Sequence, residues 1–228
     1  MSEVVHYETA HLRPLGRAYL SRRYAILFYT LLLTLVAAPI LTAFELTGAL
    51  IELLLAASLV AAVMPVSAAI SRRVLLSLTG LLWVARFVFE WFEHPALSAV
   101  SLGLWTIMGL VAAAYALRFS FHATEIDTEH LYASLSAYLL AGIFFGSFYW
   151  VLEQIVPGTF QITGAFTRMS AMYFSFVTLA TLGYGDIVPR TDIARGLAIV
   201  EGVGGQLFLA VLVARLVSLY GRSRTIES

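Results

Sequence analysis

The chain has 228 residues, of which 60% are hydrophobic and only 12% are charged, with a mean hydropathy of +0.86. Soluble domains are about 45–50% apolar and about 25% charged. One soluble core cannot bury this much apolar surface, which argues against a secreted enzyme, a nucleic-acid binder and a disordered tail and points to lipid as the solvent. The chain has 14 basic and 14 acidic residues, every basic residue is arginine, and cysteine is absent, so no disulfide framework exists.

Six stretches are apolar over the length of about 20 residues that a helix needs to cross a bilayer. They predict an all-helical membrane protein with six transmembrane helices, which lie at residues 24–44, 49–70, 74–92, 97–117, 131–156 and 194–220. The predicted domains are a cytoplasmic N-terminal tail (1–23), a four-helix domain (24–118), a linker (119–130), a two-helix domain (131–221) and a short cytoplasmic tail (222–228).

Arginine is distributed unevenly about these stretches. Nine arginines lie on the side of the two termini and three lie on the opposite side. The positive-inside rule therefore places both termini in the cytoplasm. Trp91 and Trp150 fall near the outer helix ends, where aromatic residues mark the membrane interface. We expect a multi-pass protein, and its brevity and its arginine-only basic residues indicate a bacterial inner membrane.

The first four stretches contain few charged residues. Arg86 and Glu90 are four residues apart in the third stretch and can pair on one helix face. Glu52 can join this intramembrane ion pair, which either holds the four helices together or serves a minor voltage- or ligand-sensing role. The fourth stretch carries no charge, and voltage sensing needs charge that moves across the field. The sequence therefore argues against voltage gating by this helix.

The segment between the last two stretches breaks the pattern. After a Pro157-Gly158 stop, residues 168–179 predict a helix too short to cross, with Thr167 as its N-cap. Irregular backbone follows directly, and at membrane depth such backbone requires surrounding protein or a water-filled cavity. The segment is therefore expected to be a re-entrant loop that carries the function.

The end of the short helix and the residues after it, from Thr178 to Asp186, read Thr-Leu-Ala-Thr-Leu-Gly-Tyr-Gly-Asp. Gly183 and Gly185 lie two apart, and glycine adopts left-handed conformations without steric cost. Alternate left-handed residues turn successive carbonyls to one side, and rings of carbonyls replace the water shell of a cation. The segment resembles the selectivity filter of the potassium channel family, with Leu182 where valine is commoner, and the close resemblance covers residues 131–220.

This resemblance implies roles for individual residues. The backbone carbonyls of the filter bind permeant K⁺, which is the only ligand implied, with no organic cofactor; they belong to Thr181, Leu182, Gly183 and Tyr184. The Thr181 hydroxyl closes the innermost site, Asp186 lies at the outer mouth, and the Tyr184 side chain packs against the pore helix.

The pore helix departs from some relatives behind the filter. The resemblance places Thr178, Val177 and Phe174 on this helix. Val177 stands where some bacterial channels carry a glutamate that pairs with the filter aspartate. Phe174 stands where many have tryptophan, whose N–H bonds that aspartate. Asp186 is therefore expected to lack both partners, which concerns inactivation of the filter more than its selectivity.

Two glutamates are candidates for filter support. Glu153, near the outer end of the fifth stretch, resembles a family glutamate that accepts hydrogen bonds from backbone behind the filter; the alternative is a carboxylate solvated by headgroups. Glu201 lies near mid-membrane in the sixth stretch, where a charge costs about 2.5–3.5 kcal/mol, so it should face protein or water. It either bonds the pore helix, which we favour, or biases the permeation path electrostatically.

The sixth stretch also carries a candidate gate. Gly205 aligns with the family's hinge glycine, but close packing against the pore helix explains it equally well. After Gly205, four residues at helical spacing share one face of the helix, the first polar and the others apolar. This face is expected to line the cavity and inner gate, with ordinary helix packing as the alternative. Its members are Gln206, Leu209, Val213 and Val217.

Together these features predict a subunit of a potassium-selective channel with voltage-gated-channel-like architecture, not an enzyme. One filter loop per chain implies a homotetramer in the bilayer, because a closed carbonyl ring needs four loops. No domain for a cytoplasmic ligand is expected after the pore, and a separate regulatory subunit remains open. The alternatives are a K⁺ transporter subunit working with an energy-coupling partner, and a membrane protein that kept the loop without conducting.

Overall fold

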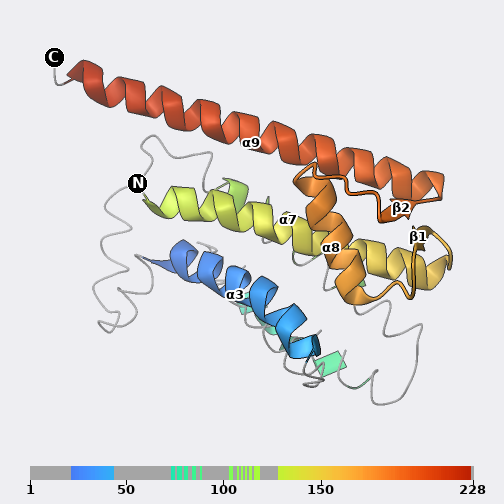
Figure 1. The fold of residues 1–228 in the computed structure, drawn as a ribbon. Coiled ribbons are helices and arrows are strands. Elements are labelled where there is room, and N and C mark those ends of the chain that lie inside the picture. Colours follow the sequence, from blue (N-terminus) through green and yellow to red (C-terminus); the bar gives the residue numbers. More distant parts are fainter. Residues whose placement is uncertain are drawn as a thin grey trace.

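A computed structural model of the chain describes residues 22–43 and 128–226, with isolated helical positions between 73 and 118 (Figure 1). In chain order the described elements are α3 (Arg23–Ala43), α7 (Thr128–Ile155), β1 (Phe160–Ile162), α8 (Arg168–Leu179), β2 (Ile187–Pro189) and α9 (Asp192–Ile226). The long helices α7 and α9 run in opposite directions, and the short helix α8 lies between them (Figure 1).

Three of the described helices are long and apolar enough to cross a membrane. They are α3, α7 and α9, with mean hydropathies of 1.7, 1.7 and 2.0 over their apolar windows. Only 28%, 33% and 17% of these windows are buried within the chain, so most of their apolar surface needs lipid or other protein. They correspond to the predicted first, fifth and sixth spans. The predicted second span lies outside the described residues, and the third and fourth do so for the most part.

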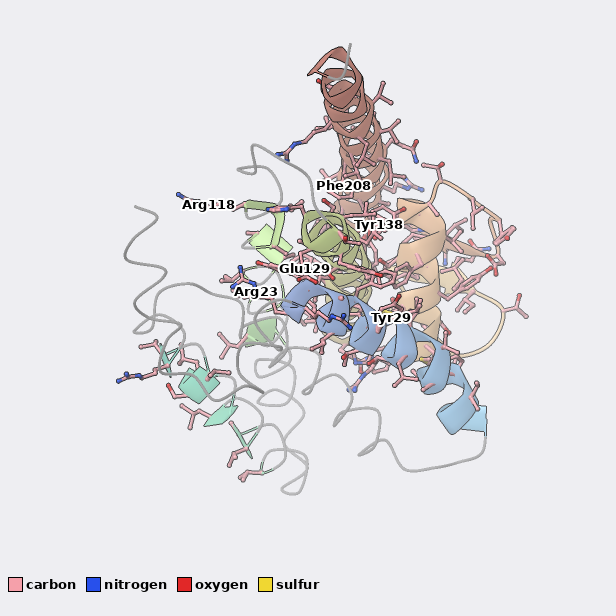
Figure 2. All side chains as sticks on the ribbon, turned by 90° about the vertical axis from the view of Figure 1, so that its left-hand side faces the viewer. Arg23, Tyr29, Arg118, Glu129, Tyr138 and Phe208 are labelled. Atoms are coloured by element: carbon pink, nitrogen blue, oxygen red, sulfur yellow. The ribbon has the colours of Figure 1, made fainter. Side chains whose placement is uncertain are left out.

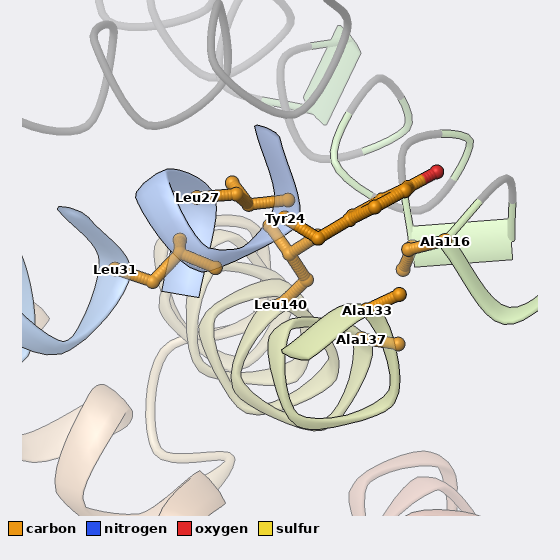
Figure 3. Close-up of a cluster of buried hydrophobic side chains, with 8 residues drawn as sticks. Tyr24, Leu27, Leu31, Ala116, Ala133, Ala137 and Leu140 are labelled. Carbon is orange, nitrogen blue, oxygen red and sulfur yellow. The ribbon is translucent and has the colours of Figure 1, made fainter. Parts of the chain in front are cut away.

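The two helices α3 and α7 begin at the same end of the molecule (Figure 1). The Tyr24 backbone N–H donates to the Glu129 carboxylate at 2.9 Å, which joins the first turns of the two helices. Beside this contact, a buried cluster packs small and large side chains against each other (Figure 3). It includes Tyr24, Leu27 and Leu31 of α3, Ala133, Ala137 and Leu140 of α7, and Ala113 and Ala116 from the predicted fourth span. The alanines let the helix backbones approach closely.

The helix α8 has the bounds that the sequence predicts. Thr167 is its N-cap, and the Thr167 Oγ1 accepts a hydrogen bond from the Ser170 N–H at 3.1 Å. Its 12 residues make it about 18 Å long. This is well short of the hydrocarbon thickness of about 30 Å. The helix is therefore held by protein, through α7 on one side and α9 on the other.

Two glycines of α7 create the surface on which α8 packs. A Cβ built on Gly142 would lie 2.6 Å from the Phe176 ring, and one built on Gly146 would lie 2.9 Å from the Cα of Met172. Only glycine therefore allows α8 this close. The sequence analysis missed both residues, although their spacing is the Gly-x-x-x-Gly signal of close helix packing in membranes.

The prediction of a purely helical fold is incomplete. β1 and β2 form a two-stranded antiparallel ladder in which Gln161 lies opposite Val188. β1 precedes α8 and β2 follows the predicted filter, so the ladder joins both ends of this loop. Strands of three residues have too little pattern to be recognised from sequence.

Two helices extend a few residues beyond the predicted domain boundaries. α7 begins at Thr128, inside the predicted linker, and α9 begins at Asp192 and continues to Ile226, through most of the predicted C-terminal tail. Both helices start with acidic first turns, which carry Glu129 and Asp192 and suit the positive end of the helix dipole. Hydropathy locates the apolar part of a helix and misses such polar ends.

Candidate functional site

The backbone after α8 alternates in the way the filter hypothesis requires. Thr181, Gly183 and Gly185 have φ angles of +55°, +59° and +79°. The sequence analysis predicted left-handed conformations at the two glycines, and the structure adds Thr181 to the series. A β-branched residue rarely adopts positive φ, at a cost of about 1–3 kcal/mol. Strain of this kind persists only where the surroundings hold the backbone in place.

Hydrogen bonds to the end of α8 hold that backbone. The Leu182 N–H donates to the Val177 carbonyl at 2.9 Å, and the Thr181 N–H donates to the Thr178 carbonyl at 3.0 Å. The first two filter residues thus satisfy carbonyls that the helix end leaves open. A third such carbonyl, that of Leu179, accepts from the Tyr138 hydroxyl of α7 at 3.3 Å.

Two side chains of the predicted filter are largely exposed in the single chain. Leu182 is 57% exposed and Tyr184 is 67% exposed. The Tyr184 ring lies parallel to the Tyr173 ring of α8, with centroids 6.4 Å apart. Tyr184 therefore does contact the pore helix, but most of its surface is free in a single chain.

The structure places another residue of α8, Tyr173, near Asp186, whereas Val177 and Phe174 offer this carboxylate no polar group. The Tyr173 phenol interacts electrostatically with the Asp186 carboxylate, and the Asp186 Oδ1 accepts a hydrogen bond from the Ile187 N–H at 3.1 Å. Phe174, the residue that the sequence analysis compared with tryptophan, is buried and its ring contacts those of Tyr149 and Phe160 at 5.0 and 5.2 Å. Consecutive side chains of a helix point about 100° apart. Tyr173 can therefore face Asp186 while its neighbour Phe174 faces the buried core.

Glu153 accepts two backbone hydrogen bonds at the outer end of α7. Its Oε1 accepts from the Gly158 N–H at 2.8 Å and its Oε2 accepts from the Phe160 N–H at 3.0 Å. These donors belong to the loop after α7 and to β1, and not to the filter itself. Any support that Glu153 lends the filter therefore passes through the ladder of β1 with β2.

Replacing Glu153 by glutamine is expected to destabilise this loop. The glutamine amide has only one acceptor oxygen, whereas the two backbone N–H groups need two. Its NH₂ group would therefore face one of these N–H donors. We expect the free energy of unfolding to fall by about 1–2 kcal/mol. A hydrogen bond to a charged group contributes about 1.5–3 kcal/mol, and the more exposed of these two bonds contributes less. Thermal unfolding in lipid nanodiscs measures it, with the exposed neighbour Gln154→Ala as the control. An unchanged unfolding temperature for Glu153→Gln would contradict this role.

Glu201 is buried between three helices, with 1% of its surface exposed. The Tyr149 hydroxyl of α7 donates to Oε2 at 2.7 Å, and the Ser175 hydroxyl of α8 lies 2.5 Å from Oε1. The side chain thus contacts the pore helix and does not face the open side of α9. The sequence analysis did not single out Tyr149 or Ser175, because only the packing of α7 and α8 brings them to Glu201.

Gly205 lies where α9 crosses the end of α8. A Cβ on this residue would lie 2.7 Å from the Leu179 carbonyl oxygen and 2.8 Å from its Cδ1. α9 is one uninterrupted helix of 35 residues through this point. The structure therefore gives Gly205 a packing role, and its role as a hinge stays a prediction.

One face of α9 is open to the surroundings of the chain. The Gln206 side-chain N–H donates to the Thr181 Oγ1 at 3.3 Å, which joins the predicted cavity lining to the predicted innermost ion site. Further along, Leu209 is half-buried, whereas Val213 and Val217 are 57% and 67% exposed.

On the side of α9 toward α7, the Tyr138 and Phe208 rings stack with centroids 5.9 Å apart (Figure 2). They line an apolar cavity of about 240 Å³ that also reaches Glu201.

The predicted ion pair of Arg86 and Glu90, with Glu52, lies outside the described residues. Of the part of the chain that the structure describes, no group of three or more His, Asp or Glu residues is arranged to hold a metal ion. The candidate site described above is the predicted filter with the side chains that position it.

Comparison with known proteins identifies this part of the chain. Residues 133–222 match the family described as "Ion channel". The chain is 47% identical over 60 residues to the Two-pore potassium channel 4 of Arabidopsis thaliana, covering 25% of this chain and 21% of that protein. It is 41% identical over 51 residues to the Probable potassium channel protein 2 of Methanocaldococcus jannaschii, covering 21% and 15%. Residues 133–222 thus match an ion-channel family, and these similar proteins are named as potassium channels.

The matched residues contain most of α7, all of α8, the predicted filter and nearly all of α9. A third relative, the Inward rectifier potassium channel Kirbac3.1 of Paramagnetospirillum magnetotacticum, is 34% identical over 72 residues, which cover 32% of this chain and 22% of that protein. The chain thus spans between 15% and 22% of the length of these three relatives. No solved structure is significantly similar to the chain.

Proposed function

We propose that the protein is the subunit of a potassium-selective channel that conducts K⁺ passively. The observation that carries this proposal is the alternation of left-handed residues at Thr181, Gly183 and Gly185, directly after a helix too short to cross a membrane. Such a backbone directs successive carbonyls to one side, where they replace the hydration shell of a cation. Relatives named as potassium channels are similar to part of this chain, and residues 133–222 match an ion-channel family.

The proposed assembly is a homotetramer with fourfold symmetry. A single chain supplies one line of carbonyls, and a closed ring needs four. The exposure of Leu182, Tyr184 and Val217 supports this, because these apolar surfaces have no cover within one chain. In the tetramer the carbonyls of residues 181–184 bind K⁺, the Thr181 hydroxyl closes the innermost site, and the open face of α9 lines the cavity and gate.

The proposed topology has six spans, with both termini in the cytoplasm of a bacterial inner membrane. It requires the first and fifth spans to begin at the same face, and α3 and α7 do begin at the same end (Figure 1). The predicted fourth span, residues 97–117, carries no charge. We therefore propose a channel that is not voltage-gated through that helix. A regulatory subunit encoded separately is compatible with this scheme.

Reconstitution in planar bilayers with opposed K⁺ and Na⁺ gradients tests the function. The expected reversal potential lies near the equilibrium potential of K⁺, and the conductance changes little with voltage. A reversal potential near the Na⁺ value, or the absence of flux under every gating condition, would overturn the proposal. Flux that occurs only with an energy source would favour the alternative, a transporter subunit.

A further inference from the structure

Glu201 takes part in a chain of three short contacts between side chains and backbone. The Tyr149 hydroxyl lies 2.7 Å from Oε2 of Glu201, and the Ser175 Oγ lies 2.5 Å from its Oε1. The same Ser175 Oγ lies 2.7 Å from the Gly142 carbonyl oxygen of α7. The contacts join α9, α8 and α7 directly behind the filter, and all the side chains involved are buried.

The number of hydrogens in this chain depends on the charge of Glu201. If the carboxyl group is ionised, only the hydroxyls of Tyr149 and Ser175 supply hydrogens, and the Gly142 carbonyl supplies none. The Tyr149 hydrogen lies in the contact with Oε2. The single Ser175 hydrogen would then have to fill two contacts, one to Oε1 and one to the Gly142 oxygen. Two hydrogens are therefore available for three contacts.

The neutral carboxylic acid removes this conflict. Its Oε1–H donates to the Ser175 Oγ, and the Ser175 hydroxyl then donates to the Gly142 carbonyl. The Tyr149 hydroxyl still donates to Oε2. Each contact now contains one hydrogen, and each donor has one acceptor.

The surroundings of Glu201 favour the neutral form as well. The titratable groups that face it are the phenols of Tyr149 and Tyr138 from α7, while α8 contributes only the Ser175 hydroxyl. Within the described part of the chain no arginine or histidine contacts its carboxyl group. A buried carboxylate without a cation is strongly disfavoured, since desolvation is not repaid by an opposite charge.

We propose that Glu201 is a neutral carboxylic acid whose proton completes a hydrogen-bond chain through Ser175 to the Gly142 carbonyl, and that this chain positions the pore helix. Its importance for conduction depends on the proposed channel function, whereas the protonation state does not. Glu201 is a positioning residue, because it acts on the filter through Ser175 and α8. When alkaline pH removes the proton, one of the three contacts loses its hydrogen and the attachment of α8 weakens.

Glutamine substitution separates this proposal from a merely structural carboxylate. In Glu201→Gln the amide NH₂ takes the place of the O–H donor to Ser175, and the amide oxygen accepts from Tyr149. We expect this variant to keep the unfolding temperature and the ion selectivity of the wild type. Glu153→Gln is the matched control, because both oxygens of Glu153 accept N–H groups and the same substitution must break one bond.

Two measurements on the full chain in nanodiscs test the proposal. Infrared spectroscopy at neutral pH should show the C=O stretch of a protonated carboxyl group, which Glu201→Gln removes and Glu153→Gln retains. Thermal unfolding of the wild type should shift to lower temperature as the pH rises, with a smaller shift in Glu201→Gln. Absence of the band, or equal destabilisation by Glu201→Gln and Glu201→Ala, would overturn the proposal. Because neither readout involves ion flux, failure of the channel function would leave this result standing.

Discussion

The substitution Gly183→Ala is expected to abolish potassium selectivity or prevent assembly of the pore. Gly183 has a φ of +59°, a conformation that costs an L-residue with a Cβ about 1–2 kcal/mol. The cost recurs in each chain, so that a tetramer would accumulate about 4–8 kcal/mol at one ring of carbonyls. The backbone relieves this strain by rotating, and the rotation turns a carbonyl away from the ion path.

The measurement for Gly183→Ala is the reversal potential with K⁺ and Na⁺ on opposite sides of a bilayer, together with the tetrameric fraction in native gels. The matched control is Gly204→Ala, since Gly204 lies within α9 and an added Cβ meets nothing within 4 Å. The control should keep the wild-type reversal potential. An assembled Gly183→Ala channel with unchanged selectivity would refute our assignment of the filter.

The second large effect is expected for Gly205→Ala. The new Cβ would lie 2.7 Å from the Leu179 carbonyl oxygen, which belongs to the backbone at the end of α8 and cannot move aside as a flexible side chain would. Overpacking of this kind costs about 1–3 kcal/mol. Moving the end of α8 also moves the backbone that continues into Thr181, so conduction should fall together with stability.

Gly204→Ala is again the control, because the two glycines are adjacent in one helix and differ in what a Cβ would meet. Alanine is favoured over glycine inside a helix by about 0.5–1 kcal/mol, so Gly204→Ala should be neutral or slightly stabilising. Thermal unfolding in nanodiscs compares the two variants. If Gly205→Ala altered gating but kept the wild-type unfolding temperature, the hinge hypothesis would be correct and the packing role wrong.

The sequence predicted the helical elements well where composition alone decides them. α3, α7 and α9 are found because a long apolar run has no stable place outside lipid or a protein core. α8 was predicted with its N-cap because an apolar run ends at Leu179, short of a membrane crossing, and Thr167 precedes it. The glycine spacing that indicated left-handed backbone at Gly183 and Gly185 is confirmed by their φ angles.

The residues that contact the predicted filter could not be predicted from the sequence. The contact of Tyr173 with Asp186 depends on the rotation of α8 about its axis, and the sequence analysis considered only Val177 and Phe174 as neighbours of this carboxylate. The positive φ of Thr181 carries no sequence signal, since threonine does not favour it. The sequence analysis predicted that Glu153 accepts hydrogen bonds from backbone behind the filter, whereas its donors are the Gly158 and Phe160 N–H groups after its own helix.

The sequence by itself determined that this chain belongs in a membrane and that residues 178–186 carry a filter signature, because hydropathy and glycine spacing act locally along the chain. Only the tertiary structure decided that Gly205 packs on Leu179, and that Glu201 faces Ser175 and Tyr149. These relations join residues far apart in the sequence across three helices. Their distances follow from how closely the glycine faces of α7 and α9 admit α8, which no local pattern of residues expresses.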